Sequence, residues 1–102
     1  MCGIAGFIDF NNTSSRDLLI RCTDVLSHRG PDGGGYEFFQ HDHCQVGLGH
    51  RRLSIIDLSA AASQPMWYKH YCIIFNGEMY NYESVKKELQ QLGHTFITHS
   101  DT

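Results

Sequence analysis

Cysteine occupies the second position of the chain, directly after Met1. If Met1 is removed, Cys2 carries a thiol and a free α-amino group on one residue. A nucleophile with an adjacent base is the arrangement that enzymes use to attack a carbonyl carbon. We expect removal of Met1, because the side chain that follows it is small. The alternative is an incidental cysteine at a frayed terminus, and the rest of the sequence has to decide between the two.

Asn76 and Gly77 carry the groups that stabilise negative charge on an attacked carbonyl. A side-chain amide and a backbone N–H can both donate to the developing oxyanion, and the loss of one such donor costs about 3–4 kcal/mol of barrier. Glycine lets a backbone N–H approach closely and can adopt positive φ. The alternative is that Asn-Gly simply forms a tight turn.

Three charged residues suit the two ends of a free amino acid. Arg52 can hold a carboxylate through a bidentate, charge-assisted pair. Strand alternation sends Arg51 and Arg52 to opposite faces, so only one of them can point into a site. Glu78 and Asp101 suit an ammonium group, although Asp101 lies close enough to Thr102 to be a solvated acid instead.

Five segments contain these residues: 2–6, 28–32, 50–57, 75–81 and 100–101. In this order they resemble the start of a class II glutamine amidotransferase domain, and they are most similar to the glutaminase domain of the glutamine-hydrolysing asparagine synthetases. The resemblance covers residues 1–102. It implies that Cys2 is the nucleophile and that Asn76 and Gly77 form the oxyanion hole. It also implies a set of glutamine-binding residues: Arg52, Leu53, Ser54, Ile55, Ile56, Asn76, Gly77, Glu78 and Asp101.

The same resemblance implies an N-terminal-nucleophile hydrolase fold, an αββα sandwich of which residues 1–102 would be the N-terminal portion. Residues 28–32 would position the glutamine site and could close over it as a lid, and Arg51 would be a surface residue. His50 would orient the backbone near Arg52. Ala62 stands where the family tends to have glycine, so a positive φ there would strain the loop.

The implied reaction is hydrolysis of glutamine to glutamate and ammonia, with no cofactor and no metal in this part of the protein. Ammonia would pass to a synthetase domain or subunit that activates aspartate with ATP and Mg²⁺. Two alternatives stay open: an inactive or regulatory fragment, and an amidotransferase with a different ammonia acceptor. A half domain would leave an apolar sheet face exposed for a partner, such as a second copy in a homodimer.

Composition excludes several other classes. The chain has 102 residues, 41% hydrophobic and 19% charged, with a formal charge of −3, which suits one small globular domain. Basic residues form no patch for nucleic acid, and no apolar run is long enough for a membrane helix or a signal peptide. The four cysteines form no disulfide-like pattern, so we expect a cytoplasmic protein. His41, His43 and Cys44 could suggest zinc, but their spacing equally fits the polar tip of a hairpin.

Periodicity and turn residues predict an α+β fold with antiparallel neighbours. Ser14 and Asp17 would cap the first helix as a capping box, with Leu18, Leu19, Cys22, Val25 and Leu26 on its buried face. Asn81 would cap the second helix, residues 82–92, with Val85, Leu89 and Leu92 on one face, and Gly93 would end it. The remaining expected elements are a buried strand at 2–10, an irregular glycine loop at 28–35, a hairpin of strands 36–39 and 46–49, strands at 53–56, 71–75 and 95–98, and a loop at 57–64.

Overall fold

The computed structural model describes residues 2–54 and 58–102. It contains two antiparallel sheets, two α-helices and a short 3₁₀ helix, which agrees with the predicted mixture of α and β structure. The elements in chain order are β1 (Gly3–Asp9), α1 (Arg16–Asp24), β2 (Gly33–Gln40), β3 (Gln45–Arg52), η1 (Ala60–Ala62), β4 (Met66–Tyr68), β5 (Tyr71–Ile73) and α2 (Tyr82–Gln91).

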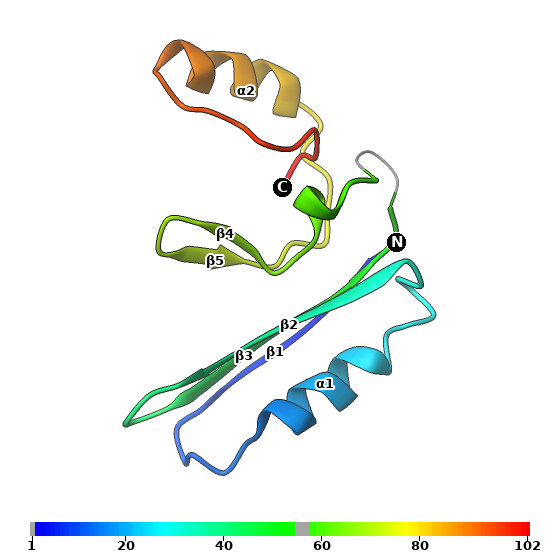
Figure 1. Ribbon diagram of the computed structural model, residues 1–102, viewed down its shortest axis with the longest axis vertical. Helices are drawn as coiled ribbons and strands as arrows, with labels where there is room; N and C mark the ends of the chain where they lie inside the picture. The colour runs from blue at the N-terminus through cyan, green and yellow to red at the C-terminus, as the bar shows by residue number, and fades with distance from the viewer. Residues whose placement is uncertain (1, 55–57) are drawn as a thin grey trace.

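The larger sheet has three strands in the order β1-β3-β2. The predicted hairpin is confirmed, because β2 pairs antiparallel with β3 around the polar tip at residues 41–44. β1 pairs with the other side of β3 in a register that places Gly3 opposite Arg51. The start of β1 and the end of β3 therefore lie together at one edge of the molecule, close to the N-terminus in Figure 1.

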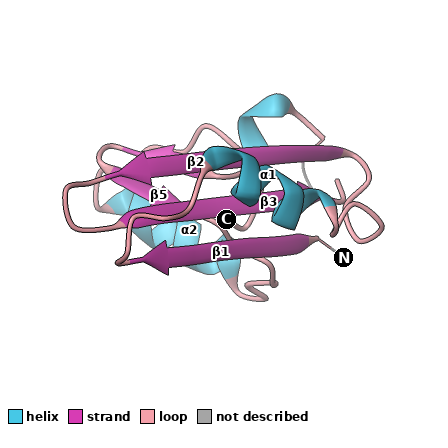
Figure 2. Ribbon diagram, turned by 90° about the horizontal axis from the view of Figure 1, so that it is seen from below, coloured by secondary structure: helices cyan, strands magenta, loops and turns pink. Residues whose placement is uncertain are grey.

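Helix α1 covers one face of this sheet, as Figure 2 shows from below. The contact is close because β3 has glycine at two positions that face the helix. A Cβ at Gly47 would lie 3.0 Å from Leu19, and a Cβ at Gly49 would lie 1.9 Å from the Thr23 hydroxyl. Leu19 and Thr23 are both 0% exposed, so this small contact is the best-buried part of the described structure.

Two details of α1 differ from the prediction. Its N-cap is Ser15, whose side chain accepts a hydrogen bond from the Leu18 N–H. Ser14 instead donates to the Asp9 carboxylate over 2.6 Å. That hydrogen bond is the main cause of the lowering of the Asp9 pKa to about 2, and the Asn11 backbone N–H adds to it.

The predicted apolar face of α1 is also wrong in part. Leu19 is buried, but Cys22 and Val25 are exposed. The buried stripe runs through Leu19 and Thr23 and continues to Leu26, which a Cβ at Gly3 would approach within 3.1 Å. A threonine replaces the expected apolar side chain because its hydroxyl donates to the Leu19 carbonyl and so needs no solvent.

The glycines at 33–35 were predicted to belong to an irregular loop. They are instead the first residues of β2. Backbone crowding explains the glycine at Gly35, because a Cβ there would lie 2.0 Å from the Gln64 carbonyl oxygen. The strand therefore tolerates glycine where another segment of the chain crosses it.

A second layer lies over the face of the sheet that α1 leaves open. It consists of the β4–β5 hairpin, with α2 beyond it (Figure 1). The Trp67 indole packs edge-on against Phe39, with ring centroids 5.7 Å apart, and donates a hydrogen bond to Glu37 over 3.2 Å. β4 was not predicted, and β5 is shorter than the expected strand 71–75.

The segments around α2 bear out some expectations and contradict others. Asn81 is the N-cap residue, although its side chain makes no capping bond, and Gly93 follows the helix with φ 95°. Leu92 is exposed, so it is not part of a buried face. Residues 95–98 form no strand, since no described strand pairs with them. The other predicted strand, 53–56, is irregular at 53–54, and residues 55–57 lie outside the described residues.

The strand β1 is less buried than its composition indicates. Ile4 and Ile8, on the face opposite α1, are exposed, and Phe10 just beyond the strand is exposed as well.

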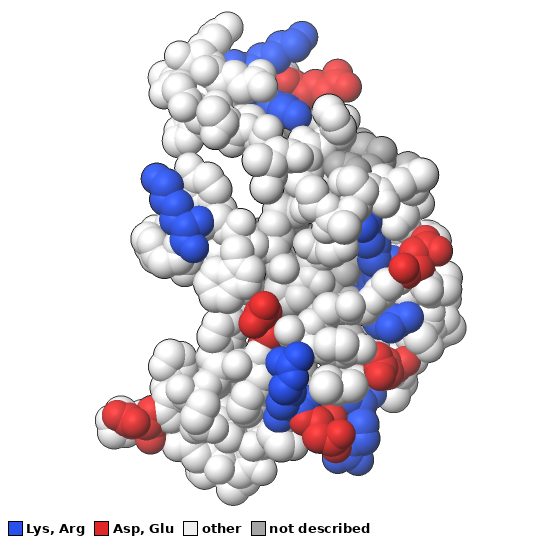
Figure 3. All heavy atoms as spheres, in the orientation of Figure 1, with Lys and Arg blue, Asp and Glu red and all other residues white. Residues whose placement is uncertain are grey.

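The charged side chains on the face seen in Figure 3 are scattered, with basic and acidic groups interspersed. No helix among the described residues is both long enough and apolar enough to cross a membrane.

Candidate active site

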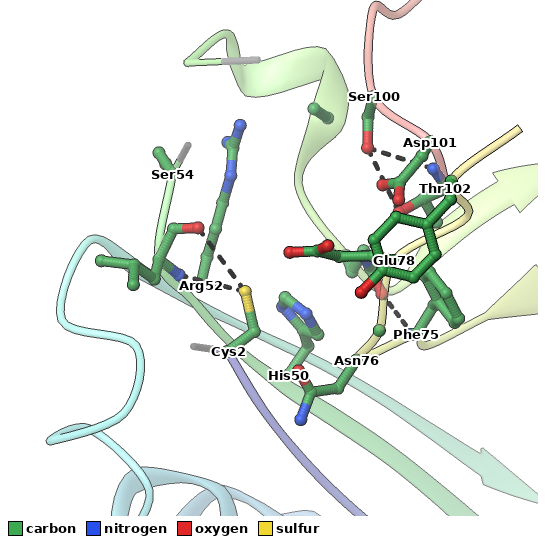
Figure 4. A pocket seen from close by; sticks show the side chains of 15 residues that line it. Cys2, His50, Arg52, Ser54, Phe75, Asn76, Glu78, Ser100, Asp101 and Thr102 are labelled. Carbon is green, nitrogen blue, oxygen red and sulfur yellow. Dashed lines mark hydrogen bonds between the residues drawn. The ribbon is translucent and has the colours of Figure 1, made fainter. Parts of the chain in front are cut away.

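A pocket of about 410 Å³ opens at the edge where β1 starts and β3 ends. Segments far apart in the sequence form its walls. In Figure 4, His50 and Arg52 come from β3 and Cys2 directly precedes β1, whereas Phe75, Asn76, Glu78 and Asp101 come from segments on the other side. The lining residues are Cys2, His50, Arg52, Leu53, Ser54, Ala62, Gln64, Phe75, Asn76, Gly77, Glu78, Tyr80, Ser100, Asp101 and Thr102.

The Cys2 side chain points into this pocket because of strand alternation. Gly3 faces α1, so the neighbouring Cys2 faces the opposite side of the sheet. The Leu53 N–H donates to Cys2 Sγ over 3.2 Å, and the Leu53 carbonyl lies 3.6 Å from the same sulfur. Arg29 donates from Nε to the Cys2 carbonyl over 3.2 Å. The thiol is thus half-buried at a defined position in the wall.

The two arginines separate as alternation predicts, with Arg52 in the pocket wall. Arg52 donates from one guanidinium nitrogen to the Ser59 carbonyl over 2.7 Å and to the Ser63 hydroxyl over 3.2 Å. Arg51 is not the surface residue that was expected, because its side chain is only 16% exposed. It donates to the Gly30 carbonyl over 3.0 Å and so connects β3 to the loop before β2.

His50 lies two residues before Arg52 on the same face of β3 and also lines the pocket. It is 2% exposed, and its Nε2 has no hydrogen-bond partner among the described residues. Burial lowers the pKa of His50, a hydrogen bond to the Phe75 backbone opposes this shift, and the nearby Arg52 charge reinforces it. The imidazole is therefore neutral near pH 7 and contacts the segment that leads to Asn76.

Asn76 and Gly77 lie together in the pocket wall, in a bend after β5. Gly77 does not have positive φ, so that reason for glycine does not apply. The reason is a close contact instead, since a Cβ at Gly77 would lie 2.9 Å from the Phe75 ring. A side chain at position 77 would therefore require the Phe75 ring to move.

The two acidic candidates also reach the pocket. Glu78 follows Gly77 directly, and Asp101 comes from the last residues of the chain. The Met79 N–H donates to Asp101 Oδ2 over 2.8 Å, which orients the carboxylate. Asp101 is half-buried and bonded, so it is not simply a solvated terminal acid.

Residues 28–32 contact residues that line the pocket, but none of them lines the pocket itself. Arg29 holds the Cys2 carbonyl, and Asp32 accepts a hydrogen bond from the Ser54 N–H over 2.8 Å. These contacts fit the expected positioning role. The role of this segment as a lid stays a prediction.

Of the other expected binding residues, Leu53 and Ser54 line the pocket, whereas Ile55 and Ile56 lie outside the described residues. Ala62 is 6% exposed and does not have positive φ, so the expected strain is absent. Within the described ranges, no three side chains of metal-binding type come together, and this includes His41, His43 and Cys44.

Sequence reasoning missed several lining residues, of which Gln64 is the most informative. It is a polar side chain that is only 8% exposed. The sequence offers little indication of a role for Gln64, because this residue precedes Pro65 in a segment for which only a loop was predicted. Tyr80, Ser100 and Thr102 were not named as site residues either, although Tyr80 and Ser100 lie in the segments 75–81 and 100–101 and Thr102 follows Asp101.

Comparison with known families shows which kind of domain this chain forms part of. The glutamine amidotransferase domain family matches the chain over residues 1–102. The chain belongs to this family. The predicted resemblance is thereby confirmed over the whole length of the sequence.

Curated relatives of this glutamine amidotransferase domain include asparagine synthetases. The chain is 43% identical to glutamine-hydrolysing asparagine synthetase 1 of Bacillus subtilis over 108 residues, which is 100% of the chain and 16% of that protein. It is 34% identical to putative glutamine-hydrolysing asparagine synthetase 2 of Methanocaldococcus jannaschii over 104 residues, 86% of the chain and 20% of that protein. It is also 40% identical to amidase chry2 of Gibberella zeae over 102 residues, 87% of the chain and 15% of that protein.

The chain therefore spans only a small fraction of the length of these relatives. No solved structure matches the chain. The antiparallel sheets agree with a glutamine amidotransferase domain, and the N-terminal-nucleophile hydrolase architecture stays a prediction.

Proposed function

We propose that the pocket hydrolyses glutamine, with Cys2 as the nucleophile. One observation supports this most strongly. The pocket gathers a thiol, the amide donors of Asn76 and Gly77, one guanidinium and two carboxylates, although these groups come from widely separated segments. Glutamine carries a carboxamide at one end and a carboxylate and an ammonium group at the other.

The charges of the pocket complement those of the substrate. Arg52 would bind the α-carboxylate, and Ser59 and Ser63 anchor its guanidinium for that task. Glu78 and Asp101 would bind the α-ammonium, and the bond from Met79 orients Asp101. The backbone of Leu53 and Ser54 would line the path between the two ends, and Ile55 and Ile56 are proposed neighbours from the same segment.

The chemistry proceeds in two steps. The Cys2 sulfur attacks the carboxamide carbon, a C–S bond forms, and the oxygen charge is met by the Asn76 side chain and the Gly77 N–H. The intermediate collapses with cleavage of the C–N bond, and the α-amine of Cys2 transfers the thiol proton to the departing ammonia. Water then attacks the thioester, the C–S bond breaks, and glutamate and the free thiol are released. This route requires removal of Met1.

Labelling with the electrophilic glutamine analogue 6-diazo-5-oxo-L-norleucine tests the proposal. We expect one adduct per chain on Cys2 and none in Cys2→Ala. The other cysteines are internal controls, because Cys22 is exposed whereas burial and the Glu37 charge raise the pKa of the Cys72 thiol. An adduct that persists in Cys2→Ala contradicts the assignment. Intact mass of active protein that retains Met1 contradicts the role of the α-amine.

For the whole protein we propose ATP-dependent synthesis of asparagine from aspartate in the cytoplasm, with Mg²⁺ and ATP in a synthetase domain or subunit. The names of the Bacillus subtilis and Methanocaldococcus jannaschii relatives support this. Glutamine labelled with ¹⁵N in its amide should give asparagine labelled in its amide. A homodimer remains a prediction, and its test is the mass of the protein in solution.

A second candidate is transfer of ammonia to an acceptor other than aspartate. Amidase chry2 favours it, since a relative with a different name is 40% identical to the chain. Glutamine hydrolysis that aspartate and ATP do not stimulate would support this candidate. A protein that binds glutamine but releases no ammonia would instead be the inactive or regulatory form.

A further inference from the structure

We infer that Gln64 is a positioning residue that holds the two ends of the proposed glutamine site at a set separation. The inference rests on the proposed function. It assigns a task to a residue that lines the pocket and is only 8% exposed. Gln64 acts through its neighbours, because both polar atoms of its side chain are engaged by the protein.

The first neighbour is the segment that carries the oxyanion donors. Gln64 Oε1 accepts a hydrogen bond from the Phe75 N–H over 2.5 Å. Phe75 directly precedes Asn76, and its ring lies against Gly77. A change in the Gln64 side chain therefore shifts Phe75, and through Phe75 it shifts both proposed oxyanion donors, Asn76 and Gly77.

The second neighbour is the segment that carries the ammonium-binding acid. Gln64 Nε2 donates to Thr102 Oγ1 over 3.1 Å. Thr102 also bonds to Ser100, through the two hydroxyls and through the Thr102 N–H, each over 3.2 Å. Asp101 lies between these two residues, so the turn that presents its carboxylate is tied to Gln64.

The backbone around Gln64 is itself held in place. Its carbonyl oxygen lies against Gly35 of β2, where there is no room for a Cβ. The preceding residues Ser59 and Ser63 hold the Arg52 guanidinium. One short segment, 59–64, thus contacts all three parts of the proposed substrate site.

Geometry gives this arrangement its importance. Productive attack requires the reacting atoms to lie about 3–3.5 Å apart, and a misplacement of about 1 Å can cost about 100-fold in rate. The Asn76 and Asp101 segments come from different parts of the chain. The Gln64 carboxamide bridges them directly by donating to one segment and accepting from the other.

The test uses Gln64→Met in the full-length protein, with Gln91→Met, an exposed glutamine on α2, as the matched control. Two reagents are compared at Cys2: 6-diazo-5-oxo-L-norleucine, which needs the amino acid site, and iodoacetamide, which needs only the thiol. We expect Gln64→Met to slow labelling by the analogue about tenfold or more. Labelling by iodoacetamide should stay within about twofold. For glutamine, kcat should fall more than KM rises, because the reacting atoms are misplaced.

A second pair of variants tests the bridge itself. Thr102→Val removes the acceptor of Gln64 Nε2, and Thr102→Ser retains it. Thr102→Val should slow labelling of Cys2 by the analogue, and Thr102→Ser should label at the rate of the unchanged protein. In the double variant with Gln64→Met, the fold decrease in labelling rate should be smaller than the product of the two single decreases, because both substitutions remove the same hydrogen bond.

The outcomes separate the two proposals. If Gln64→Met slows both reagents equally, or slows neither, the positioning role is wrong while the glutamine site stands. If the analogue fails to label Cys2 in the unchanged protein while iodoacetamide labels it, the proposed function itself is wrong, and the role of Gln64 falls with it.

Discussion

The backbone N–H of Leu53 donates a hydrogen bond to the sulfur of Cys2 over 3.2 Å. The two residues are 51 positions apart in the chain. Their contact joins the segment before β1 to the segment after β3 at the pocket wall. The sulfur of the proposed nucleophile thus accepts a hydrogen bond from the backbone of a distant segment, and the alternation that continues into β1 sets the direction of its side chain.

Two substitutions of Cys2, to serine and to alanine, should differ in their effect on the stability of the protein. Serine retains an acceptor for the Leu53 N–H, whereas alanine leaves that half-buried donor without one, at a cost of about 1 kcal/mol. We expect Cys2→Ala to unfold at lower urea concentration than Cys2→Ser, and glutaminase activity to be lost in alanine. Equal stability of the two variants would contradict a structural role for this bond.

Asn76→Ala should lower kcat for glutamine hydrolysis by about 10²–10³, because one of the two proposed oxyanion donors is removed. Asn81→Ala is the matched control. Asn81 is also exposed and is the N-cap residue of α2, but its side chain makes no capping bond. Steady-state ammonia release measures both variants. A similar loss in both would indicate damage to the segment rather than to the oxyanion hole.

Arg52→Lys should raise KM for glutamine about tenfold, because lysine retains the charge but lacks the fork that pairs with a carboxylate. The same change at Arg51 should lower stability instead, since Arg51 donates to the Gly30 carbonyl from a largely buried side chain. Glutamine titrations and urea unfolding of both variants check this. The assignment of the two arginines is wrong if their effects are exchanged.

Gly35→Ala should destabilise the protein by about 1–3 kcal/mol, because its Cβ would lie 2.0 Å from the Gln64 carbonyl oxygen. Gly33→Ala is a sharp control from the same glycine run, since nothing lies within 4 Å of a Cβ there. It should be neutral or slightly stabilising. Urea unfolding of the two variants checks this, and equal stability of the two would contradict a close contact between Gln64 and β2.

His50 should make folding stability depend on pH below neutrality. Burial lowers its pKa in the folded protein, so the unfolded chain binds the proton more readily. Stability contributed by the neutral imidazole is present above the unfolded pKa of about 6.5 and is lost as pH falls below it, towards the folded pKa. His50→Gln should flatten this part of the curve relative to the unchanged protein. Parallel curves from pH 5 to 8 would contradict it.

Local patterns predicted those elements whose formation depends on neighbouring residues. The hairpin of β2 and β3, the two helices and the left-handed Gly93 follow from turn residues and periodicity. The same reasoning failed at residues 33–35, because these glycines begin β2 rather than form a loop, and Gly35 is explained by the crossing of Gln64. It also failed at residues 95–98, since a strand requires a pairing partner that local sequence does not reveal.

The residue types of the site were determined by the sequence: the early cysteine, the Asn-Gly pair, the arginine pair and the acidic residues. Tertiary structure decided which of them share a pocket, and it added His50 and Gln64 to the pocket wall. It also decided that the Arg51 side chain is only 16% exposed rather than a surface side chain. The physical reason is that a side chain's type is local, whereas burial and hydrogen-bond partners depend on segments that meet only when the chain folds.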